Sequence, residues 1–107
     1  MSKSISFTYL SGRLTVYLSG ELDHHAAREA MRKITDLLDE YLPRHCVLEL
    51  SALRFMDSSG VALIVRLSRR MRELGGTLSV ENPVGQARRV LSCAGIDKLV
   101  HLAAIGG

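Results

Sequence analysis

The apolar residues of this chain change their spacing several times along the sequence, and this change restricts the possible folds more than any other feature. Residues 4–10 and 13–18 show the alternation or β-branched enrichment typical of strands, and Ser11-Gly12 between them is a two-residue turn signal. We therefore expect the chain to open with an antiparallel hairpin.

After Gly20 the apolar residues recur at intervals of three and four, which is typical of an amphipathic helix, and this pattern ends before Pro43. The remaining pattern predicts, in order, a strand at 46–50, a helix at 58–74, a strand at 77–80, a helix at 82–94 and a last short strand at 99–103.

This order, ββαβαβαβ, is typical of the α/β class. Strands that alternate with helices of about ten residues or more form right-handed crossovers on a largely parallel sheet. No repeat, linker or low-complexity stretch divides the sequence. We expect one domain over residues 1–107, with a mixed, mostly parallel sheet of four to five strands.

Composition excludes several classes of protein. The sequence is 47% hydrophobic, which excludes a disordered chain, and its longest apolar run, 61–65, is far shorter than the roughly 20 residues of a membrane span. The polar N-terminus lacks the apolar block of a secretory signal, so we expect a cytoplasmic protein with no membrane partner. In that reducing compartment Cys46 and Cys93 are predicted to be free thiols.

The formal net charge of +3 is unevenly distributed. Residues 1–57 carry −1 and residues 58–107 carry +4, mostly from arginines between 66 and 72 and at 88–89. No aromatic residue lies among these arginines to stack on bases, so a solvated helix face is favoured over a nucleic-acid site. We expect no direct nucleic-acid partner.

Two polar motifs follow strands that are expected to be parallel neighbours. Gly-Glu-Leu-Asp-His-His occupies 20–25, and Phe-Met-Asp-Ser-Ser-Gly occupies 55–60. Because the carboxyl ends of parallel strands meet at one edge of a sheet, Asp23 should approach Ser58 there. The sequence therefore predicts the functional site at this edge.

The second motif has two interpretations. The simpler one is a helix cap, but Asp57, Ser58 and Ser59 are more candidates than one cap needs. Gly60 follows them, although glycine costs a helix about 1 kcal/mol relative to alanine, and a missing side chain lets another chain approach the backbone. The second interpretation is a phosphate site, because the free N–H groups of a helix N-terminus favour negative charge.

The sequence shows no catalytic machinery. Adjacent residues seldom bind one ion together, so we expect Asp23 and the histidines that follow it to begin a helix rather than form a metal site. Ser58 lacks the G-x-S-x-G context of hydrolases, and no P-loop is present. We expect neither an enzyme nor a cofactor.

Together the two motifs resemble those of STAS domains in the anti-sigma factor antagonist family, and most of all its sporulation members. Gly75-Gly76 and residues 92–99 also fit the later pattern of the family, so the resemblance covers the whole chain. Family members usually continue into a further C-terminal helix. Because this sequence ends at Gly107, we expect that helix to be short or absent.

The resemblance implies a phosphorylation switch. In such proteins the first serine after the aspartate, here Ser58, is phosphorylated by an anti-sigma factor that is a GHKL-type serine kinase, and a PP2C-type phosphatase removes the phosphate. The unphosphorylated form binds that kinase and frees the sigma factor for transcription. Carried over by motif position, the partner-binding residues would be Glu21, Asp23, His24, Asp57, Ser59 and Gly60.

Two alternatives stay open on the sequence. One is a STAS module of a general stress or other signalling pathway, in which the same serine serves a different kinase. The other is a small nucleotide-binding protein, although no phosphate-cradling loop in the sequence supports it.

Overall fold

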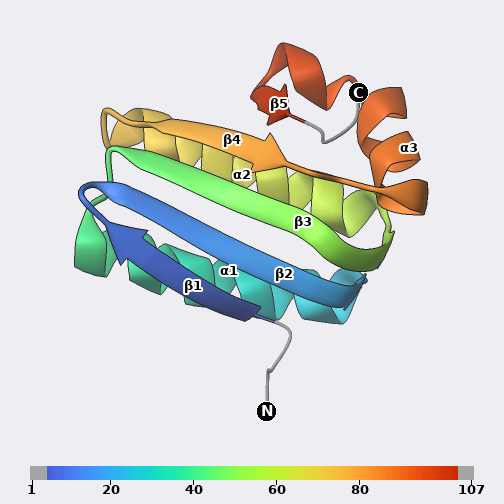
Figure 1. The fold of residues 1–107 in the computed structure, drawn as a ribbon, viewed down its shortest axis with the longest axis horizontal. Helices are drawn as coiled ribbons and strands as arrows, with labels where there is room; N and C mark the ends of the chain where they lie inside the picture. The colour runs from blue at the N-terminus through green and yellow to red at the C-terminus, as the bar shows by residue number, and fades with distance from the viewer. Residues whose placement is uncertain (1–4, 104–107) are drawn as a thin grey trace.

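The computed structural model describes residues 5–103 and shows one sheet of five strands in chain order (Figure 1). The α/β class and the mostly parallel sheet are as predicted. The strands are β1 (Ile5–Leu10), β2 (Arg13–Leu22), β3 (His45–Met56), β4 (Thr77–Glu81) and β5 (His101–Ala103), of which only the β1–β2 pair is antiparallel. The helices are α1 (His24–Tyr41), α2 (Ser58–Glu73), α3 (Gly85–Cys93) and a 3-10 turn, η1 (Ile96–Lys98).

Two expectations fall outside the described residues. The first strand was expected from residue 4, and the C-terminal helix of the family concerns the chain after β5, whereas residues 1–4 and 104–107 are not described.

The opening hairpin forms as predicted. Ser11 and Gly12 have φ values of 50° and 84°, and positive φ at both central residues is what a two-residue type I′ turn requires. The Gly12 carbonyl accepts hydrogen bonds from the amides of Arg44 and His45, at 2.8 and 3.1 Å. These bonds tie the hairpin turn to the beginning of β3.

The core lies between the sheet and two helices. α1 and α2 lie side by side against one face of the sheet (Figure 1). Aliphatic side chains from the strands and both helices are fully buried there, and each contributes about 1.5–3 kcal/mol by leaving water. Examples are Leu14 and Val16 on β2, Leu48 and Leu50 on β3, Ile34 and Leu38 on α1, and Leu67 and Met71 on α2.

β2 and β3 extend further than the sequence pattern predicts. They end at Leu22 and Met56, so the first residues of both polar motifs belong to strands. Register shifts between β2 and β3 near Ser19 and Gly20 interrupt the alternation of buried and exposed residues. This irregularity explains why the predicted β2 ends too early, at Leu18, while the apolar run 46–50 marks only the first part of β3.

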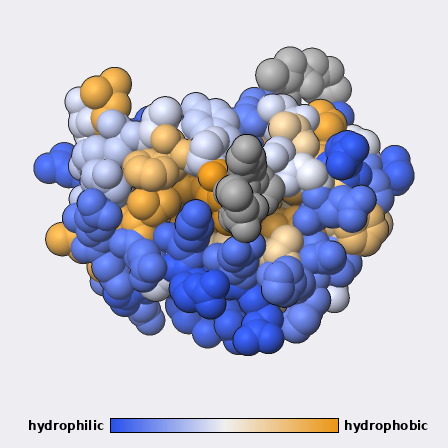
Figure 2. Space-filling view, turned by 90° about the horizontal axis from the view of Figure 1, so that it is seen from below, coloured by the Kyte–Doolittle hydropathy of each residue, from blue (hydrophilic) through white to orange (hydrophobic). Residues whose placement is uncertain are grey.

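The side of the molecule formed by β1 and α1 carries an aromatic cluster. Phe7 and Tyr9 of β1 pack against Tyr41 of α1, with ring centroids 5.7 and 4.6 Å apart. Figure 2 shows this side, where an apolar strip runs above a hydrophilic surface. The cluster joins the outer strand to the end of the first helix.

The two cysteines differ in their surroundings. Cys46 is buried in β3, where burial raises the pKa of its thiol to about 12, while Cys93 is exposed at the end of α3, and both are free. Within residues 5–103, no helix has both the length and the apolar character needed to span a membrane.

Candidate functional site

The two polar motifs meet at the carboxyl edge of the sheet, as predicted. Leu22 and Met56 are register partners on β2 and β3, so the aspartate that follows each one leaves the sheet beside the other. Only Asp23 separates β2 from α1, and only Asp57 separates β3 from α2. Glu21 is exposed near the end of β2.

Both aspartates cap the helices that follow them. The Asp23 carboxylate accepts a hydrogen bond from the Ala26 amide at 2.9 Å, and the Asp57 carboxylate accepts one from the Ser59 amide at 2.8 Å. Each bond satisfies a backbone donor that the helix leaves unpaired, with a typical value of about 1 kcal/mol. The capping interpretation is therefore correct for the aspartates and leaves the serines to be explained.

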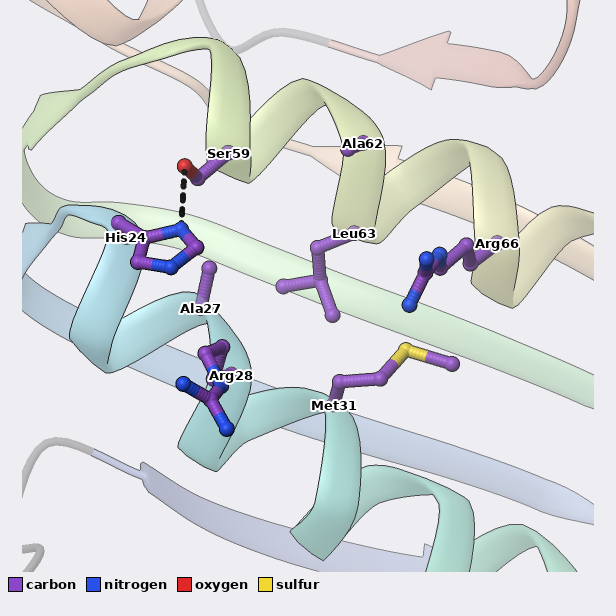
Figure 3. Close-up of a pocket in the computed structure, with 8 residues that line it drawn as sticks. All are labelled: His24, Ala27, Arg28, Met31, Ser59, Ala62, Leu63 and Arg66. Atoms are coloured by element: carbon purple, nitrogen blue, oxygen red, sulfur yellow. Dashed lines mark hydrogen bonds between the residues drawn. The ribbon is translucent and has the colours of Figure 1, made fainter.

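The two serines of the second motif have different surroundings. Ser59 is half-buried, and its hydroxyl lies 3.4 Å from Nδ1 of His24, the exposed first residue of α1 (Figure 3). Ser58 is exposed as the first residue of α2, and its hydroxyl bonds to none of the described residues. Ser58 thus presents a free hydroxyl at the positive end of the α2 dipole.

Gly60 is required by packing inside the molecule. It is buried in the first turn of α2, and a Cβ there would lie 2.6 Å from Met56 Cγ and 3.1 Å from Leu22 Cδ2. The side chains that end β2 and β3 already occupy the space beside its backbone. The close approach that Gly60 permits within the molecule is therefore between α2 and the sheet, and its role in binding a partner stays a prediction.

The end of β3 is held by a side chain that the sequence reasoning did not single out. The Met56 amide donates to Gln86 Oε1 at 2.8 Å, and Gln86 Nε2 donates to the Met56 carbonyl at 2.8 Å. The pairing of β3 with β4 ends earlier, at Glu49, so the Gln86 amide replaces a neighbouring strand. No local pattern in the sequence marks this long-range contact.

An apolar groove adjoins Ser58 between α2 and α3, and we call it the Ser58 groove. It is a shallow, open hollow of about 890 Å³, and its lining includes Phe55, Ser58, Val61, Arg89, Val90 and Cys93. An open apolar surface beside a polar rim is typical of a protein interaction site. The groove offers no metal site, since residues 5–103 contain no group of three or more His, Cys, Asp or Glu side chains that could hold an ion.

Comparison with known proteins agrees with this arrangement. The STAS domain family matches residues 5–104. The anti-sigma F factor antagonist of Paenibacillus polymyxa is 32% identical over 95% of this chain and 87% of its own length, and the anti-sigma-B factor antagonist of Bacillus subtilis is 25% identical over 85% and 82%. The structure of the anti-sigma factor antagonist SpoIIAA in its unphosphorylated form superposes with a TM-score of 0.80, at 26% identity over 94% of this chain and 89% of that one. The chain belongs to the STAS-domain family and, within it, to the anti-sigma factor antagonists.

Proposed function

We propose that the unphosphorylated chain binds an anti-sigma factor that is a GHKL-type serine kinase, and that phosphorylation of Ser58 by this kinase ends the complex. The observation that carries the proposal is the exposed hydroxyl of Ser58 at the start of α2, which bonds to none of residues 5–103 and lies next to an apolar groove. Binding releases the sigma factor in the cytoplasm, and a PP2C-type phosphatase restores the unphosphorylated chain.

The position of Ser58 supports both halves of this switch. The α2 N-terminus stabilises a phosphate within the domain, so phosphorylation leaves the fold intact. The same phosphate adds about −1.5 to −2 charges beside Asp57, on the rim that a partner must cover. A poorly paired charge inside an interface costs about 2–5 kcal/mol, which corresponds to roughly 30-fold or more in affinity.

The remaining motif residues form the rim of the proposed interface. Glu21, Asp23 and His24 lie at the end of β2 and the start of α1, next to Asp57 and Ser59 at the start of α2. We propose that the kinase contacts this rim, while the domain itself acts by binding and carries no catalysis.

The proposal is tested by incubating the purified chain with candidate anti-sigma factor kinases and ATP. We expect one phosphate, mapped by mass spectrometry to Ser58. Ser59→Ala should still be phosphorylated, whereas Ser58→Ala should not, because the Ser59 hydroxyl is half-buried against His24. Phosphate on Ser59, or none with any kinase, would contradict the proposal.

Binding gives an independent test. Ser58→Asp should lose at least about 30-fold in affinity for the kinase in a calorimetric titration, because it places a permanent charge at the interface. Ser58→Asn is the matched control, since it adds a side chain of the same size without the charge. Undiminished affinity of Ser58→Asp would rule out the charge mechanism.

A stress-response partner is the second candidate, because the chain also resembles an anti-sigma-B factor antagonist, at 25% identity compared with 32% for the anti-sigma F relative. The two candidates predict the same serine and different kinases. Phosphorylation rates with both kinases of the source organism decide between them, and the higher identity favours the sigma F type.

A further inference from the structure

A second groove starts beside Ser59, on the side of α2 that faces α1 (Figure 3). It runs between α1 and α2, and we call it the α1–α2 groove. Its first section has a volume of about 170 Å³ beside His24 and Ser59, and an adjoining section of about 310 Å³ continues toward Thr35. The two sections share Arg28, Met31 and Arg66, so they form one continuous channel along the helix pair.

The floor and the rim of this groove differ in chemistry. Apolar side chains from both helices make the floor, and Figure 3 shows Leu63 of α2 pointing toward α1, where Ala27 and Met31 lie. In the same view Arg66 of α2 extends into the space between the helices. Covering this floor with an apolar side chain of a partner favours binding, because it removes apolar surface from water.

Arginines make the rim. Arg28 and Arg32 on α1 and Arg66 on α2 line the groove, and none of them forms an ion pair with the described residues. Further along the same helix pair, by contrast, Arg70 pairs with Asp39 at 2.9 Å. Asp36 is the acidic residue of the lining, so the groove keeps an excess of positive charge.

We infer that the α1–α2 groove docks an acidic amphipathic segment of the anti-sigma factor kinase, in addition to the contacts around Ser58. Positive charge around an apolar floor is complementary to a segment with apolar residues on one side and Asp or Glu beside them. The groove opens at Ser59, one residue from Ser58, so a kinase seated on the phosphorylation site reaches it without leaving the surface. This inference rests on the proposed function.

The test compares charge reversals inside and outside the groove. Arg28→Glu with Arg66→Glu should weaken binding of the kinase that phosphorylates the wild-type chain by at least about tenfold, because two attractive contacts become repulsive. Arg72→Glu is the matched control, since Arg72 is exposed on α2 and lines neither groove. The association rate of the wild type should also fall more steeply with salt than that of the double variant.

Each outcome decides the inference. Unchanged kinase affinity of a folded double variant overturns it while leaving the proposed function intact, whereas failure of the wild type to bind any anti-sigma factor kinase removes both. If the double variant does not fold, Arg28→Gln with Arg66→Gln makes the same comparison with no added charge. Binding of duplex DNA that depends on these arginines, with kinase affinity unchanged, would assign the groove to nucleic acid and overturn the inference.

Discussion

The carboxyl edge of the sheet and the amino ends of β3 and β4 differ in whether all their polar side chains have hydrogen-bond partners within the described residues. At the amino ends, His45 bonds to the hydroxyls of Thr77 and Ser79. Arg13, the first residue of β2, pairs at 3.3 Å with Glu81, the last residue of β4. At the carboxyl edge, the Ser58 hydroxyl has no partner among the described residues. The difference indicates that the amino ends are satisfied within the chain, while the carboxyl edge keeps a group free for another molecule.

Glu49, in the middle of β3, is an example of a partly buried polar side chain whose hydrogen bonds are all made within the chain. Burial alone would raise the pKa of its carboxyl, but hydrogen bonds from Asn82 and from Ser51 outweigh burial and lower that pKa. None of the buried side-chain nitrogen and oxygen atoms within residues 5–103 lacks a hydrogen bond. Free polar groups are therefore restricted to the surface.

The largest effect on stability should come from the close packing of Gly60 against the ends of β2 and β3. We expect Gly60→Ala to destabilise the fold by about 1–3 kcal/mol, although alanine is the better helix former, because the new methyl group would overlap Met56. Urea denaturation measures the difference.

A double-mutant cycle identifies the cause. Met56→Ala removes the atom that Gly60→Ala would overlap, so the double variant should lose less stability than the sum of the two single variants. Strict additivity would show that Gly60 matters for another reason, such as the contact of a partner with its backbone.

A smaller loss of stability should distinguish the capping residue Asp57 from Ser58, whose side chain caps nothing. Asp57→Ala should cost about 0.5–2 kcal/mol, because the Ser59 amide loses its acceptor, and Asp57→Asn should restore most of this. Ser58→Ala should change stability by less than about 0.5 kcal/mol. If Ser58→Ala cost as much as Asp57→Ala in thermal unfolding, the contrast between structural and functional polar groups would fail.

The sequence predicted the parts of this molecule that depend on local pattern. The hairpin turn at Ser11, the order of strands and helices, and the meeting of the two motifs all follow from periodicity and from the geometry of parallel strands. The contact of Gln86 with Met56 and the packing role of Gly60 depend on residues brought together by the tertiary fold, and no local pattern encodes them. α3 begins at Gly85 and not at residue 82 as predicted. Asn82-Pro83 is typical of a helix start, but Asn82 has a left-handed φ of 59°, which no helix accommodates.

The smallest effect should appear as a pH dependence at the amino ends. Burial, and then Arg13, lowers the pKa of His45 below 6.5, although Glu81 opposes the shift. Because the unfolded chain takes up the proton more readily than the folded one, the contribution of His45 is fully present above about pH 6.5 and declines as the pH falls through and below that value. We expect the urea midpoint to fall between about pH 7.5 and pH 5.5, and His45→Gln to reduce that slope. An unchanged slope in His45→Gln would mean that burial and Arg13 do not hold this histidine neutral in the folded chain.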